Sequence, residues 1–223
     1  IDKVKWEYKC TFTASEELTG KEMINLIFNG LDTYAAVYLN NEKILDADNM
    51  HRTWKIDIKK RIKPGDNELH IVFDSPIERG MDALNKYGYL LPASNDQSEN
   101  GGMGKNRVSV FTRKAGYHYG WDWGPRFVTS GIWRDVVIEA CNNIYINDLY
   151  IQQDHIDKKE AKITAKVNLC NITDGTYQIL LIDQSDKKTI QTVTARLTEG
   201  NNRIEVPAVI KNPRLWWPIG MGD

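Results

Sequence analysis

The stretch KWEYKCTFT, residues 5–13, alternates apolar and polar side chains with a period of two. The apolar positions are Trp6, Tyr8, Cys10 and Phe12. This alternation is typical of a strand in an antiparallel sheet that has one face in the core and one face in water. We therefore predict a strand here, with Cys10 buried as an unreactive thiol.

The same period continues through the first 140 residues and then through the rest of the chain. Strands are predicted at 22–28, 33–45 (with a turn at Asn40-Asn41), 53–58, 68–73, 107–114 and 130–140, and then at 143–154, 161–171, 176–184, 189–200 and 203–210. A short helix is expected near 77–86. Because strands and helices do not alternate, a doubly wound fold is excluded and an all-β fold with β-sandwich architecture is predicted. We expect one domain over 1–141 and another over 142–223.

Composition narrows the classes of function. The 223 residues carry a formal net charge of -1, which gives no basic surface for nucleic acid, and no apolar run is long enough to span a membrane. Three cysteines without a CxxC pair and four scattered histidines form no recognisable metal-ligand set, so neither metal nor cofactor is expected. The glycine-rich segment GGMGKN at 101–106 departs from the phosphate-loop pattern and predicts only a loop.

One segment does not fit a strand or a helix. GWDWGP, residues 120–125, places Trp121, Asp122 and Trp123 between glycines and a proline. In a regular strand Asp122 would point away from the two indoles, so only an irregular backbone presents all three to one ligand. Aromatic faces match the apolar C–H surfaces of a sugar, and a carboxylate accepts hydrogen bonds from its hydroxyls. The alternative is that the indoles fill a sandwich core. Arg126 is the only nearby cation in the sequence.

Three stretches resemble β-mannosidases of glycoside hydrolase family two. RKAGYHYGWDWGPRFVTSGIWRDVVIEA (113–140) resembles the end of the family's amino-terminal domain, and GLDTYAAVYLNNEKILDADNMHRTWKIDI (30–58) resembles earlier strands of that domain. NPRLWWPIGMGD (212–223) resembles a segment near the end of the domain that follows. The first stretch is specific to the mannosidase branch, whereas the other two are shared more widely within the family.

The resemblance implies a jelly-roll sugar-binding domain, then an immunoglobulin-like β-sandwich, with family residues before Ile1 and after Asp223 completing both. In the family a (β/α)8 barrel follows and carries the two catalytic glutamates. The implied partners are thus that downstream barrel and the terminal β-mannosides of oligosaccharides. We nominate no catalytic residue in this chain. Trp121 and Asp122, supported by Trp123, take the family role of completing the pocket for the terminal mannose.

The leading hypothesis is therefore the non-catalytic amino-terminal part of an exo-acting β-mannosidase. A stand-alone carbohydrate-binding module, a purely structural pair of sandwiches and a fragment of a β-galactosidase or β-glucuronidase stay open as alternatives. A glycan-degrading role favours a periplasmic or secreted location.

Overall fold

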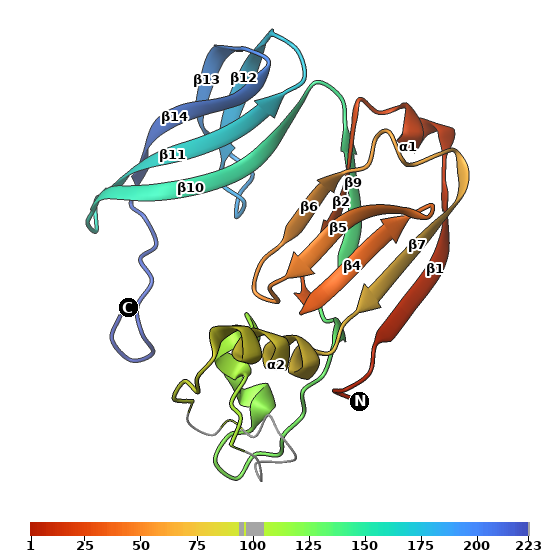
Figure 1. Cartoon of the computed structure of the whole chain (residues 1–223). Helices are drawn as coiled ribbons and strands as arrows, with labels where there is room; N and C mark the ends of the chain where they lie inside the picture. The colour runs from red at the N-terminus through yellow and green to blue at the C-terminus, as the bar shows by residue number, and fades with distance from the viewer. Residues whose placement is uncertain (94–95, 97–104, 223) are drawn as a thin grey trace. The chain divides into compact units, whose positions relative to one another are not determined.

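The computed structural model describes residues 1–93, 96 and 105–222, and it divides the chain into two compact units, Ile1–Ala140 and Cys141–Asp223 (Figure 1). Both units are built from antiparallel strands, and the prediction of an all-β fold with a jelly-roll-like sandwich followed by an immunoglobulin-like sandwich is confirmed. The helices are short and belong to the first unit.

The first unit has two main sheets and one short strand pair. One sheet has the order β1-β7-β4-β5, the second has the order β6-β2-β9, and β3 pairs with β8. The bounds are β1 Trp6–Ala14, β2 Met23–Phe28, β3 Leu31–Asp32, β4 Tyr34–Leu39, β5 Glu42–Asp48, β6 Trp54–Asp57, β7 Gly65–Phe73, β8 Gly131–Ile132 and β9 Val136–Cys141. The β4–β5 hairpin turns at Asn40 and Asn41, whose φ angles of 51° and 68° suit asparagine.

The core of this unit forms where apolar faces of the two main sheets meet. β2 contributes Ile24, Leu26 and Phe28, and β7 contributes Ile71 and Phe73, all of them buried. These are the inward positions that the alternation predicts. Burying side chains of this size contributes about 1.5–3 kcal/mol each, so this contact supplies a large share of the unit's stability.

Cys10 is exposed, so the prediction of a buried thiol is wrong. The prediction read the correct face, because Cys10 pairs in register with Leu69, which is buried. However, β1 is an edge strand of its sheet, and its core-facing side is only partly covered. Trp6 and Tyr8 on the same face are also substantially exposed. Alternation identifies the face of a strand but not whether the neighbouring layer extends over it.

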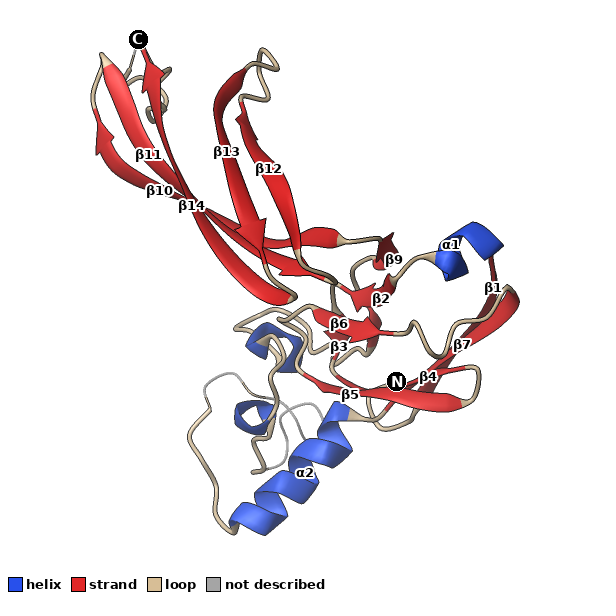
Figure 2. Cartoon of the chain, turned by 90° about the horizontal axis from the view of Figure 1, so that it is seen from above, coloured by secondary structure: helices blue, strands red, loops and turns tan. Residues whose placement is uncertain are grey.

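Apart from α1, the described helices gather at one end of the first unit (Figure 2). α2 spans Pro76–Tyr87, close to the predicted helix, whereas α1, Glu16–Gly20, lies at the other end of the sheets (Figure 1). The strand predicted at 107–114 is wrong, because Ser109–Phe111 forms a turn of 3-10 helix, η2. Val108 is buried against α2, whereas Val110 faces solvent. The apolar residues that predicted a strand here therefore do not form one face of a sheet, and Val108 packs against a helix instead.

The second unit consists of a three-stranded sheet, β10-β11-β14, and a two-stranded sheet, β12-β13. Their bounds are β10 Ile144–Ile156, β11 Glu160–Asn171, β12 Gly175–Ile182, β13 Thr189–Leu197 and β14 Gly200–Lys211. All five predicted strands are confirmed. The inward residues of β11 are the predicted Ile163, Ala165, Val167 and Leu169, and the last three of these pack with Leu197 and Val206 in the core of the unit.

We predict that Gly30→Ala destabilises the first unit by about 1–3 kcal/mol, because a Cβ at this buried position would overlap the indole of Trp133. Gly20→Ala is the matched control, since a Cβ there meets no atom within 4 Å. Its stability should stay within about 0.5 kcal/mol of the parent protein. Urea unfolding of the three proteins measures both effects, and equal midpoints for the two variants would contradict the prediction.

Candidate functional site

The finger loop, which we define as residues 119–126, rises from a buried anchor at the helical end of the first unit. The 3-10 turn η3, Gly116–Tyr119, leads into it, and the ring of Tyr119 is completely buried with Ile77 and Val128. Burial raises the pKa of the Tyr119 phenol, so the ring stays neutral at physiological pH. The loop therefore starts from a fixed point.

The tip of the finger loop is a tight turn. Trp121 and Gly124 form an isolated antiparallel bridge in which the Gly124 amide donates to the Trp121 carbonyl. Asp122 follows Trp121 with a φ of 40°, a left-handed conformation that aspartate and asparagine tolerate better than most residues. Gly120 enters the turn with a φ of 121°, which only glycine adopts readily. The expectation of an irregular backbone is confirmed.

All three residues singled out by the sequence lie at this tip and face solvent. Trp121 is 60% exposed and Trp123 is 96% exposed, so the alternative in which the indoles fill a core is wrong. Asp122 is exposed and makes no hydrogen bond or ion pair with any residue that the structure describes. An open hollow beside the tip is lined by Ser109, Gly116, Tyr117, Gly120 and Trp121. The tip thus offers aromatic surface and one carboxylate to a ligand.

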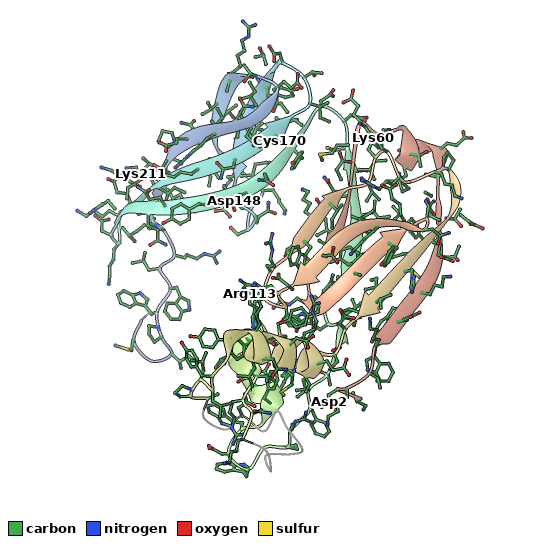
Figure 3. The ribbon with its side chains drawn as sticks, in the orientation of Figure 1. Asp2, Lys60, Arg113, Asp148, Cys170 and Lys211 are labelled. Carbon is green, nitrogen blue, oxygen red and sulfur yellow. The ribbon has the colours of Figure 1, made fainter. Side chains whose placement is uncertain are left out.

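Arg126 does not neutralise Asp122, contrary to what its place in the sequence indicates. Its guanidinium pairs with Asp2, labelled in Figure 3, at the start of the chain. Burial raises the pKa of Asp2, but the hydrogen bond and charge of Arg126, a backbone hydrogen bond and the charge of the N-terminal ammonium together outweigh burial and lower the pKa. The carbonyl of Asp2 also accepts from Ser75, which caps the N-terminus of α2. Arg126 therefore ties the outgoing side of the finger loop to the scaffold.

A buried ion pair lies near the two ends of the finger loop. Lys114 pairs with Asp32 of β3 and also donates to the Thr129 carbonyl at 2.8 Å. The side chain of Lys114 is 0% exposed and that of Asp32 is 5% exposed. The Thr33 hydroxyl donates to the second carboxylate oxygen of Asp32. The sequence gives little sign of this pair, because a lysine usually predicts a solvated side chain.

His118 stands beside this pair, with its Nδ1 3.8 Å from the Asp32 carboxylate. Burial lowers the pKa of His118, and the charge of Lys114 lowers it further. The His118 carbonyl accepts from the Phe127 amide at 3.0 Å, which closes the base of the finger loop. Trp133 lies in the supporting structure, where its indole donates to the Met50 carbonyl at 3.2 Å.

Within 1–93, 96 and 105–222, no three His, Cys, Asp or Glu side chains lie close enough together to hold a metal ion. No helix in this described part has the length and apolar character needed to cross a membrane. The GGMGKN segment lies largely outside the described residues.

Comparisons with known proteins cover the whole chain. Residues 1–134 match the glycosyl hydrolase 2 galactose-binding domain-like family, and residues 144–223 match glycosyl hydrolases family 2. Beta-mannosidase B from Neosartorya fischeri is 35% identical over 225 residues, which is 100% of this chain and 25% of the relative. The chain thus spans about a quarter of the length of this curated relative.

Solved structures agree with this match. The β-D-mannosidase from Dictyoglomus thermophilum superposes with a TM-score of 0.82 at 30% identity, over 100% of this chain and 26% of that protein. A β-glucuronidase from Bacteroides uniformis gives a TM-score of 0.64 at 18% identity, over 95% of this chain and 22% of that one. The second likeness shows the fold alone.

We predict that His118 makes the first unit less stable in mild acid. Since its folded pKa lies below the ordinary value of 6.5, the unfolded chain binds a proton first as the pH falls below that value. Stability is then lost from about pH 7 downward toward the folded pKa. His118→Gln lacks this proton uptake, so its stability relative to the parent should improve between pH 7.5 and about pH 5. Urea unfolding across this range tests it, and a difference independent of pH would contradict it.

Proposed function

The chain belongs to glycosyl hydrolases family 2, and from this membership we propose that it is the non-catalytic amino-terminal part of an exo-acting β-mannosidase. In this proposal the finger loop reaches the active site of the whole enzyme and grips the terminal β-D-mannosyl residue of an oligosaccharide. The observation that carries the proposal is the tip itself, where Trp121, Asp122 and Trp123 occupy one tight turn and face solvent.

The exposure of the tip supports a role in binding. Large aromatic side chains stabilise a fold when they are buried, so two exposed indoles in one turn contribute little to this unit. Asp122 has no polar partner among the described residues, and its lone pairs are available to the hydroxyls of a sugar. A carboxylate that accepts from hydroxyls in a pocket closed to water forms strong, charge-assisted hydrogen bonds.

The choice of a mannoside rests on the comparisons. The two mannosidases are 30–35% identical to this chain over its whole length, whereas the β-glucuronidase is 18% identical. We therefore favour mannose over galactose or glucuronic acid as the terminal sugar.

The chemistry of cleavage is assigned to the rest of the enzyme. A retaining glycosidase needs an acid/base and a nucleophilic carboxylate about 5–5.5 Å apart on the two sides of the glycosidic bond. We nominate no such pair in these residues. The relatives are about four times as long as this chain, and we assign the pair to a (β/α)8 barrel in the remaining length.

In the full-length enzyme, Asp122→Asn should lower kcat/KM for a β-mannoside by roughly ten- to hundredfold. That range corresponds to losing a hydrogen bond to a charged group, about 1.5–3 kcal/mol. Asparagine tolerates the positive φ at this position, so the melting temperature should hardly change. Asp122→Ala should lose the same activity and also some stability, because alanine in a left-handed conformation costs about 1 kcal/mol or more.

The matched control is Asp135→Asn, which alters another exposed aspartate of the first unit. Its kcat/KM should stay within about twofold of the parent enzyme. Normal kcat/KM in Asp122→Asn would show that the carboxylate does not contact substrate.

The 223-residue chain alone should bind mannose with a dissociation constant of about 1 mM or weaker, equivalent to about -4 kcal/mol. One loop covers only part of a small sugar, and the entropy lost on capture is not offset by other pocket walls. Isothermal titration calorimetry measures this directly. Micromolar affinity would instead indicate a self-sufficient carbohydrate-binding module.

The same chain should release no nitrophenol from a nitrophenyl β-mannoside, because the catalytic pair is assigned to the barrel. A preparation carried through the same purification without the protein gives the background rate. Turnover above that rate would place a catalytic pair within these residues.

A further inference from the structure

The buried pair of Lys114 and Asp32 joins segments that are far apart in the sequence. Lys114 precedes η3, which leads into the finger loop, whereas Asp32 belongs to β3. Both side chains are removed from water, at 0% and 5% exposure. Their contact therefore fixes the ingoing side of the finger loop to the scaffold of the first unit.

The outgoing side is held by the same ammonium group. Lys114 donates to the Thr129 carbonyl at 2.8 Å, and two residues later β8 begins at Gly131. β8 returns to the same scaffold strand, because Gly131 pairs in register with Asp32. Three contacts thus converge near Asp32: an ion pair, a hydrogen bond and a strand pair. They fix the spacing between the two sides of the loop.

Stability alone does not explain charges at this position. Removing an ammonium and a carboxylate from water costs several kcal/mol per ion, and well-packed apolar residues of similar volume often stabilise a fold as well or better. An apolar pair would form no directional hydrogen bonds and so would not fix the relative orientation of the segments. The ammonium has a limited set of donor directions, two of which are used by Asp32 and Thr129, and the Thr33 hydroxyl orients the Asp32 carboxylate.

We propose that Lys114 and Asp32 are positioning residues for substrate binding, which set where the tip of the finger loop presents Trp121 and Asp122. This inference rests on the proposed function of the loop. Among the described residues no hydrogen bond or ion pair joins the tip to either charged residue, so their effect on catalysis passes through the loop backbone. The Arg126–Asp2 pair supports the outgoing side alone, and it is less buried, at 17% and 19% exposure.

The test replaces the charges by amides in the full-length enzyme, as Asp32→Asn with Lys114→Gln. Amides leave no buried charge unpaired, but glutamine is shorter than lysine and cannot reach both partners. We expect kcat/KM for a β-mannoside to fall roughly tenfold, with KM rising more than kcat falls, because substrate contact is weakened. Near-ultraviolet circular dichroism and the melting temperature establish that the protein is folded.

The decisive measurement repeats this change in a background in which the tip is disabled by Trp121→Ala and Asp122→Asn. If the pair acts only by positioning the tip, the same two amides should change kcat/KM there by less than about threefold. An equal loss in both backgrounds overturns the inference, as does a folded amide variant with normal kcat/KM. Normal kcat/KM in the tip variant itself overturns the proposed function, and the inference with it.

Thr33 provides a milder variant if the amide pair does not fold. Thr33→Val keeps the volume but removes the hydroxyl that orients Asp32, whereas Thr33→Ser keeps the hydroxyl. We expect a loss of kcat/KM of about threefold or more for the valine variant and less for the serine variant, again abolished in the tip-disabled background. Equal activities for the two variants would overturn the inference.

Discussion

The ammonium group of Lys114 has no access to water, and this constraint determines how the end of the first unit is built. A buried cation needs an anion and further acceptors close to it, which Asp32 and the Thr129 carbonyl supply. To meet that need, the segment entering the finger loop, the segment leaving it and β3 must all converge on one point. Tyr119 and Val128, which lie between these segments, are buried, and the tip of the finger loop between them faces solvent.

Two opposite requirements meet in this loop. Its ends are fixed by Tyr119 in a core and by the Phe127 amide on the His118 carbonyl, whereas its tip presents Trp121 and Trp123 to solvent. Exposed aromatic surface next to a fixed base is the arrangement expected of a preorganised binding element, because little backbone freedom at the base remains to be lost on binding. A jelly-roll-like sandwich suits this purpose, since its strands form a stiff frame and its end loops are free to vary.

The sequence predicted those features that depend on neighbours along the chain. Period-two alternation identified Ile24, Leu26 and Phe28 of β2 as core residues, and the glycines around Asp122 identified a turn, because both follow from local backbone geometry. Prediction from the sequence failed where contacts between distant segments determine the structure. Val108 alternates like a strand residue yet packs under a helix, and Lys114 resembles a surface lysine until Asp32, 82 positions away, is brought against it. No local pattern encodes either partnership. The assignment of the tip to a sugar rests on resemblance and chemistry, not on the fold.

The exposed position of Cys10 on the edge strand β1 has a consequence for handling the protein. A thiol in contact with solvent is open to oxidation, to a sulfenic acid or to a disulfide with another molecule, whereas a buried thiol is protected. Two such thiols on different copies form a disulfide only when an oxidant such as dissolved oxygen removes two electrons and two protons. A reductant keeps this thiol reduced, and a surface that covered Cys10 in a larger protein would shield it from oxidation.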